Sequence, residues 1–267
     1  MEDYSEMDYK VVLDHERLRV YQKGIEFIAF VEDRIAGVPT PSRNWSIDNL
    51  DRAAVSIVHN VALGNAKSTA ASRLKYFETG CASALECAAC LDIMEIKELI
   101  SESSRNNGKE CLADVCRMLV GLCRSEDRRE NAAELPRAVT CPQGSHVRFN
   151  HEQLDVYRRS LKLVRCLHDL AIEDLMPAAY QGRLDKLSTS ICLNIAEGNG
   201  RFSRIDHKRF LTIATESALQ AAAWLDVAAA KGLLEGKSRH PAKQLMVRIV
   251  QMLEKMKQSL SSDNAGC

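Results

Sequence analysis

The segment LDHERLRVYQ (residues 13–22) returns 136 positions later as FNHEQLDVYR (residues 149–158). Five of the ten positions carry the same residue, including the His-Glu pair and the tyrosine. Self-similarity at a fixed period is the sequence signature of a duplicated structural unit. The chain of 267 residues also exceeds the usual size of a single domain. We therefore expect two copies of one fold in tandem.

Further matches follow at an offset of 134 and confirm that the duplication extends well beyond the first segment. The matched pairs are Leu50-Asp51 with Leu184-Asp185, Ser56-Ile57 with Ser190-Ile191, Asn60 with Asn194, Gly64-Asn65 with Gly198-Asn199, Ser83-Ala84-Leu85 with Ser217-Ala218-Leu219, and Leu91-Asp92 with Leu225-Asp226. The offset changes by two residues, which indicates a shortened loop. The stretch with Gly37, Pro39 and Pro41 is its natural position, because glycine and proline mark turns.

Each copy has the hydrophobic pattern of four amphipathic helices. In the second copy, Leu154, Tyr157, Leu161 and Val164 recur at the three-and-four spacing of one helix face. A composition with 46% hydrophobic but only 5% aromatic residues suits packed helices better than sandwiches or barrels. Short connections favour antiparallel neighbours. The predicted fold class is all-α, with two tandem up-down antiparallel four-helix bundles.

The predicted boundaries follow from turn residues and loss of periodicity. The first bundle takes residues 1–125, a linker takes 126–148, and the second bundle takes 149–267. The expected helices of the first copy are 14–36, 44–64, 69–104 and 107–125. In the second copy, a helix over 180–197 is expected to stop at Gly198 in the left-handed conformation. Ser203 is expected to cap the third helix and Pro241 to open the fourth.

The net charge is zero, but the two halves differ in sign. Residues 1–140 carry 18 basic and 23 acidic residues, a net −5, and residues 141–267 carry a net +5. A neutral total argues against nonspecific coating of nucleic acid, whereas a basic half suits an anionic partner or the acidic half of a neighbouring subunit. The first ten residues lack an apolar targeting segment, and no run of about 20 apolar residues is present. We expect a cytoplasmic protein, away from membranes, with reduced cysteines.

The second copy resembles a known family. The telling residues are Asn194-Ile195-Ala196-Glu197-Gly198-Asn199-Gly200-Arg201, followed by Phe210-Leu211 and Ala214-x-x-Ser217. They resemble the four-helix-bundle proteins encoded in intervening sequences of bacterial large-subunit ribosomal RNA genes, which include the accessory variability protein of diversity-generating retroelements. The resemblance covers roughly residues 150–258 well and 14–120 weakly. It implies an up-down bundle without a catalytic site and a tendency to form closed rings. For the retroelement member it also implies binding to nucleic acid and a reverse transcriptase.

The first copy departs from the family pattern at the turn. It reads Asn60-Val61-Ala62-Leu63-Gly64-Asn65-Ala66-Lys67, so the family glutamate is Leu63 and the second glycine is Ala66. Any chemistry of this turn therefore belongs to the second copy.

The candidate binding surface is the turn after the second helix of the second copy. Its basic residues are Arg201, Arg204, His207, Lys208 and Arg209. The start of the third helix adds unpaired amides and the positive end of the helix dipole, which suits phosphate or an acidic protein face. The alternative is a solvated helix end in which Arg201 pairs with Glu197.

A second set of residues marks the turn itself. Asn194 and Glu197 lie three apart on one helix face, followed by Gly198 and Gly200. A structural role is favoured, because a polar asparagine in a helix usually satisfies backbone or neighbouring groups.

The sequence predicts no metal, no cofactor and no catalytic residues. Cys87-Ala88-Ala89-Cys90 lies inside a helix, whereas redox CxxC motifs stand at helix N-termini, so these cysteines are expected in the core. Cys141 and Cys267 are the expected exposed thiols. No Glu-x-x-His pair for a diiron bundle, no nucleophile motif and no phosphate loop occurs.

The leading hypothesis is a non-catalytic scaffold or adaptor that forms a homo-oligomer through its bundles and takes a protein partner. The alternative is an accessory protein that binds RNA or DNA through its basic second bundle, together with a reverse transcriptase or structured RNA.

Overall fold

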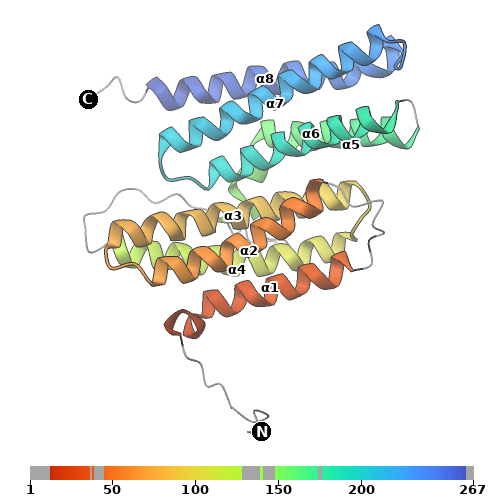
Figure 1. The fold of residues 1–267 in the computed structure, drawn as a ribbon. Helices are drawn as coiled ribbons and strands as arrows, with labels where there is room; N and C mark the ends of the chain where they lie inside the picture. Colours follow the sequence, from red (N-terminus) through yellow and green to blue (C-terminus); the bar gives the residue numbers. More distant parts are fainter. Residues whose placement is uncertain are drawn as a thin grey trace, which may run out of the picture.

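A computed structural model describes residues 13–36, 38, 45–127, 139–140, 148–173 and 176–262. Its long elements are all α-helices, four in each repeat, and they form two up-down antiparallel bundles (Figure 1). The predicted fold class is confirmed. The first repeat contains a 3-10 turn η1 (Asp14–Arg17), α1 (Arg19–Ile35), α2 (Trp45–Asn65), α3 (Ala70–Ile96) and α4 (Glu102–Asp127).

The second repeat has the same order of elements. It contains a 3-10 turn η3 (Asn150–Gln153), α5 (Asp155–Ile172), α6 (Ala178–Asn199), α7 (Arg204–Ala230) and α8 (Gly236–Ser262). Before η3, the two-residue strands β1 (Val139–Thr140) and β2 (Arg148–Phe149) pair antiparallel. Part of the predicted linker is therefore ordered, and α4 reaches Asp127 rather than ending at residue 125.

The two repeats share internal hydrogen bonds as well as sequence. Ser56 and Ser83 join α2 to α3 at 2.8 Å between hydroxyl oxygens, and Ser190 and Ser217 join α6 to α7 at 2.9 Å. In both repeats the matching asparagine donates from Nδ2 to the serine carbonyl four residues earlier, at 2.7 Å. These polar pairs fix the same helix register twice. The duplication is thus also a duplication of packing detail.

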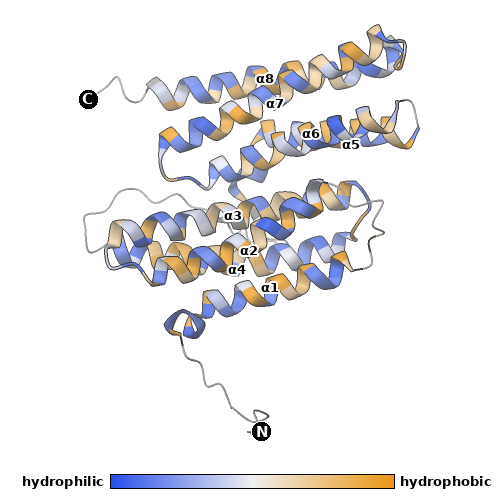
Figure 2. Cartoon of the chain, viewed as in Figure 1, coloured by the Kyte–Doolittle hydropathy of each residue, from blue (hydrophilic) through white to orange (hydrophobic). Residues whose placement is uncertain are grey.

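The bundles lie side by side, with α3 of the first facing α6 of the second (Figure 1). Hydrophobic residues alternate with polar ones along the helices in Figure 2, as expected for amphipathic elements. The helix α3 departs from this pattern, since every residue from Gly80 to Met94 except Glu86 is buried. A helix that is apolar all round is covered on all sides. The buried residues of both repeats accordingly form one continuous core.

Two predicted boundaries between the third and fourth helices of the first copy are wrong. The third helix of the first copy was expected to reach residue 104, but α3 ends at Ile96. Glu98 adopts a left-handed φ of 60°, and the amide of Leu99 donates to the carbonyl of Met94 at 2.9 Å. This pattern of bonds terminates a helix. The helix α4 then begins at Glu102, earlier than predicted, because the Ser101 hydroxyl accepts from the amide of Ser104 at 3.1 Å.

The other boundary differences concern helix starts. Pro241 does not open α8 but is its sixth residue, since the helix begins at Gly236. Only one intrahelical bond, to the carbonyl four residues earlier, is lost there. In the first repeat, α1 begins at Arg19 after η1, because Leu18 is extended at φ −72° and ψ 125°. Ser203 caps α7 as predicted, accepting from the amide of Asp206.

Some predictions fall outside the described residues. These are the loop with Gly37, Pro39 and Pro41 and the thiols of Cys141 and Cys267. Within the described part of the chain, none of the helices combines the length and apolar character needed to cross a membrane.

Candidate functional site

The turn after α6 faces the first repeat instead of solvent. Arg201 is held by three groups: Glu197 Oε1 lies 2.5 Å from its Nη2, Thr79 Oγ1 lies 3.3 Å from its Nη1, and the Phe210 ring centroid lies 5.0 Å from its Cζ. The amide of Phe202 donates to Glu78 Oε1 on α3 at 2.7 Å. The pairing of Arg201 with Glu197, the alternative weighed from the sequence, is present. Arg201 is committed to the contact between the repeats.

The five predicted basic residues are divided by this arrangement. Arg204, Lys208 and Arg209 are exposed on the first turns of α7. Lys208 donates to Ser261 of α8 at 2.9 Å, and Arg209 lies over the Phe210 ring at 5.3 Å. His207 is half-buried, and burial lowers its pKa. A binding surface at this helix end would therefore consist of the three exposed cations.

The residues of the turn motif have local structural contacts. Asn194 bonds to Ser190 within α6, as described above. The expectation of a left-handed Gly198 is wrong, because α6 continues to Asn199 and Gly198 is a helical residue. A Cβ at Gly198 would lie 2.9 Å from the Cβ of Phe210, and one at Gly200 would lie 2.8 Å from the Cα of Ala82. Both glycines permit close approach of helices.

A cluster that the sequence did not indicate lies where the two repeats meet. We call it the junction cluster: Asp92 of α3, Lys109 of α4, His151 and Glu152 of η3, and Tyr157 of α5. Lys109 Nζ contacts Asp92 Oδ1 and lies 2.9 Å from Glu152 Oε1. The Tyr157 hydroxyl donates to Asp92 Oδ2 at 2.9 Å. The cluster therefore links α3 and α4 of one repeat to η3 and α5 of the other.

The junction cluster is almost closed to solvent. The side chains of Asp92 and Lys109 are each 8% exposed, and His151 is fully buried. The His151 ring stacks on Phe149 at 5.9 Å between centroids and meets Tyr157 edge-on at 4.6 Å. Neither of its ring nitrogens has a hydrogen-bond partner among the described residues. This ring acts as an aromatic packing element.

Burial shapes the titration of the cluster. Burial and then the nearby Lys109 ammonium lower the pKa of His151 well below its usual range, so the ring is neutral. Burial raises the pKa of Glu152, although Lys109 opposes that shift. Burial and the Asp92 carboxylate raise the pKa of Tyr157, so its hydroxyl keeps its proton. The protonated phenol and the lysine ammonium are thus the donors, and the carboxylates are the acceptors.

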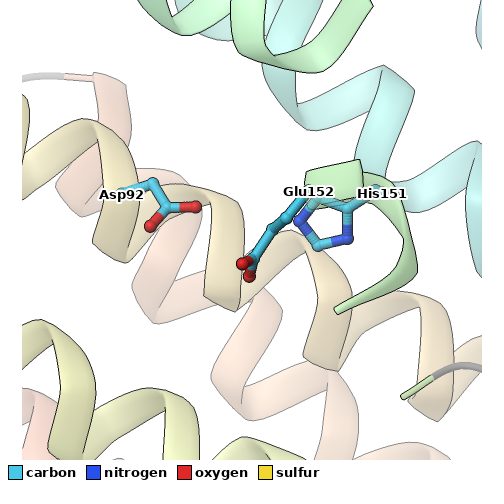
Figure 3. A group of neighbouring side chains, drawn as sticks. All are labelled: Asp92, His151 and Glu152. Carbon is cyan, nitrogen blue, oxygen red and sulfur yellow. The ribbon is translucent and has the colours of Figure 1, made fainter. Parts of the chain in front are cut away.

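Figure 3 shows Asp92, His151 and Glu152, whose potential ligand atoms lie within 4.8 Å of one another. Two carboxylates and an imidazole are a donor set that a divalent cation accepts. Here, however, the Lys109 ammonium contacts both carboxylates and supplies the positive charge. A cation would have to displace a buried ion pair, so the cluster does not fit a metal centre.

Further contacts lie in the seam, our term for the whole contact between the first and the second repeat. Lys97, directly after α3, pairs with Asp185 of α6, and Arg165 lies 3.6 Å from Glu98. Glu86 is the one residue between Gly80 and Met94 of α3 that is only partly buried. Burial, with a smaller contribution from Glu197, raises the pKa of Glu86 to about 7. The buried cysteines behave as core residues, and burial raises the pKa of Cys87 and Cys90 well above the usual value.

The fold and the seam define a class: a tandem pair of four-helix bundles whose ionisable groups hold the repeats together. Comparison with protein families identifies the class further. The family model of the 23S rRNA-intervening sequence protein matches residues 16–121 and again residues 152–255. The chain belongs to this family, as a tandem duplication. Comparison with curated proteins and with solved structures gave no match.

Proposed function

We propose that the chain is a non-catalytic scaffold that assembles through its bundles and presents them to a protein partner in the cytoplasm. The observation that carries this proposal is the commitment of the junction cluster. Lys109, Glu152, Asp92 and Tyr157 satisfy one another, so none is poised for a substrate. One use of a buried ion pair is to specify how two surfaces meet, and we infer that use here.

The packing at the seam also supports a scaffold. The two repeats bury one continuous core, as an obligate interface does. None of the eight described cysteines forms a disulfide, which suits a reducing compartment. Surfaces by which one bundle packs on another can also bind the bundles of a further chain.

The test is the mass of the purified protein in solution. Sedimentation velocity and light scattering across the micromolar range should show assemblies larger than one chain. A strict monomer at every concentration contradicts the self-assembling scaffold. Metal analysis of the same preparation should show no stoichiometric transition metal, and a stoichiometric metal would contradict the non-catalytic assignment.

A second candidate function is binding of RNA or DNA through the second bundle. It is favoured by the three cations that remain exposed at the start of α7, Arg204, Lys208 and Arg209. Lys208 also lines a groove of about 420 Å³ between α7 and α8, together with Lys257. Phosphate groups bind to such helix starts.

This candidate is tested with a fluorescent structured RNA titrated over salt. Reversal of Arg204, Lys208 and Arg209 to glutamate should abolish binding, and acidic residues are tolerated at a helix start. Reversal of the exposed Arg17, Lys75 and Arg124 of the first bundle changes net charge equally and serves as the control. Equal affinity of the two variants would contradict binding at α7, and no binding by the unaltered chain at low salt would leave the scaffold alone.

A further inference from the structure

The contact between the repeats joins two different faces. One face, which we call the plug, consists of η3, the start of α5, and α6 with the turn that follows it in the second repeat. The other, which we call the socket, consists of α3 and the start of α4 in the first repeat. Because the repeats are homologous, each chain carries a second plug on its first repeat and a second socket on its second repeat.

The second plug has the geometry of the first. His15, Glu16 and Tyr21 match His151, Glu152 and Tyr157 in sequence. His15 meets Tyr21 edge-on at 4.8 Å between centroids, against 4.6 Å for the junction pair. Leu18 and Leu154 are both extended between the 3-10 turn and the helix. The hydroxyl of Tyr21 makes no hydrogen bond within the described part of the chain.

The second socket is also formed in advance. Asp226 of α7 pairs with Lys243 of α8 at 2.6 Å, just as Asp92 pairs with Lys109. The junction pair is 8% exposed on both sides, but Asp226 is 52% and Lys243 30% exposed. Arg239 contacts the other oxygen of Asp226 at 2.9 Å. A carboxylate oxygen accepts more than one hydrogen bond, so a tyrosine hydroxyl can still be added there.

Each of the two unpaired faces carries an exposed leucine. Leu219 of α7 is 55% exposed, although its counterpart Leu85 is fully buried against the second repeat near Gly200. On the second plug, Leu63 of α2 is 48% exposed where the second repeat has Glu197. A Cβ at Gly200 would lie 2.8 Å from Leu85 Cδ1, so in the register of the internal contact Ala66 of one chain would meet Leu219 of another.

We propose that a second copy of this chain places its first repeat on the second repeat of its neighbour and repeats the internal contact. Tyr21 and Glu16 of one chain then meet Asp226 and Lys243 of the next. Asp51 meets Lys231, as Asp185 meets Lys97 within the chain. This inference rests on the proposed scaffold function and names its partner and register.

Charge favours the same arrangement. The first half of the chain carries −5 and the second half +5, so a head-to-tail contact brings opposite charges together. The external contact is less close at one corner, because Ala66 replaces Gly200. A Cβ at position 200 would lie 2.8 Å from the Ala82 backbone, so Ala66 requires a small displacement. The contact between chains is therefore weaker than the internal one and depends on concentration.

Two experiments test the pairing by sedimentation velocity. The first compares Leu219→Glu with Val247→Glu, a change on α8 at the same exposure of 55%. Leu219→Glu should weaken self-association by at least tenfold, and Val247→Glu should leave it unchanged. Unchanged thermal melting of both variants by circular dichroism shows that they remain folded.

The second experiment exchanges a charge pair. Asp51→Lys alone and Lys231→Asp alone should each weaken association, because like charges then face each other. The double variant should recover it, since every contact between chains regains an opposite pair. Among the described residues, α2, which carries Asp51, and α7, which ends beside Lys231, are not a packed pair within one chain, so recovery indicates a contact between chains.

The outcomes separate this pairing from the scaffold proposal. Assembly that survives all the single variants overturns the pairing and leaves the scaffold intact. Weakening by the single variants without recovery in the double variant also overturns the assigned register. A monomeric unaltered chain overturns both proposals.

Discussion

Replacement of Lys109 by methionine tests the junction cluster most directly. Methionine keeps the apolar stem but removes the ammonium between Asp92 and Glu152. Two carboxylates, 8% and 15% exposed, then lose their counterion. Loss of one partner from a buried ion pair costs about 3–5 kcal/mol of the free energy of unfolding.

The chain contains its own control. Lys243 forms the matching pair with Asp226 on the surface, where the lysine is 30% and the aspartate 52% exposed. Because exposed pairs contribute about 0–1 kcal/mol, Lys243→Met should cost no more than that. Urea unfolding of dilute protein, below the concentration at which chains associate, gives both values.

The loss should also depend on pH. Burial raises the pKa of the Glu152 carboxyl above its value in the unfolded chain, and without the ammonium nothing on Lys109 opposes that shift. A raised carboxyl pKa means that stability is lost as pH rises through the unfolded value, about 4. The deficit of Lys109→Met should therefore be small near pH 4 and full at pH 7. Equal losses for Lys109→Met and Lys243→Met, or a deficit independent of pH, would refute the reasoning.

Three other changes follow from the backbone and the seam. Glu98 and Gly232 both have a left-handed backbone, at φ 60° and 68°. Glu98→Gly should therefore raise the free energy of unfolding by about 1 kcal/mol, and Gly232→Ala should lower it by a similar amount. Urea unfolding measures both values, and opposite signs would contradict the helix-end geometry. Gly200→Ala should cost about 1–3 kcal/mol, because its Cβ would meet the α3 backbone. A Cβ added at Gly182 would have no neighbour within 4 Å, so Gly182→Ala should instead raise the free energy of unfolding by about 0.5–1 kcal/mol. Similar thermal melting of the two variants would contradict a close approach of the backbones at Gly200. Glu86→Gln should stabilise by up to about 3 kcal/mol at pH 8 and by little at pH 4, because its folded pKa of about 7 exceeds the usual 4.5 and stability is lost as pH rises between them. A constant difference over that range, measured by urea unfolding, would contradict the raised pKa.

The helical class and the repeat were accessible from the sequence because they rest on periodicity. The seam was not, because the two plugs read almost alike. His15-Glu16 and His151-Glu152 are the same residues, and only their neighbours in space decide that His151 is buried and Glu152 is 15% exposed. The apolar run from Gly80 to Met94 was the available signal, since a helix without a polar face needs cover on every side.

The basic residues after α6 were predicted as one exposed surface, but the structure separates them. Arg201 and Arg204 are equivalent as charges in the sequence, yet Arg201 faces Glu197 and Thr79, whereas Arg204 remains exposed. Proximity in sequence does not reveal which side of a turn another domain covers. The end of α3 was missed for a local reason, because nothing in a glutamate side chain indicates a left-handed backbone at residue 98.

The fusion of two bundles also imposes a parity on any closed assembly. Each chain contributes two bundles, so a ring of such chains always contains an even number of them. If the rotation at each contact closes a circle after an odd number of bundles, complete chains cannot satisfy it without distortion. They would instead leave one plug and one socket unpaired, as in an open strand. The duplication thereby limits the symmetries that an assembly of this protein can adopt.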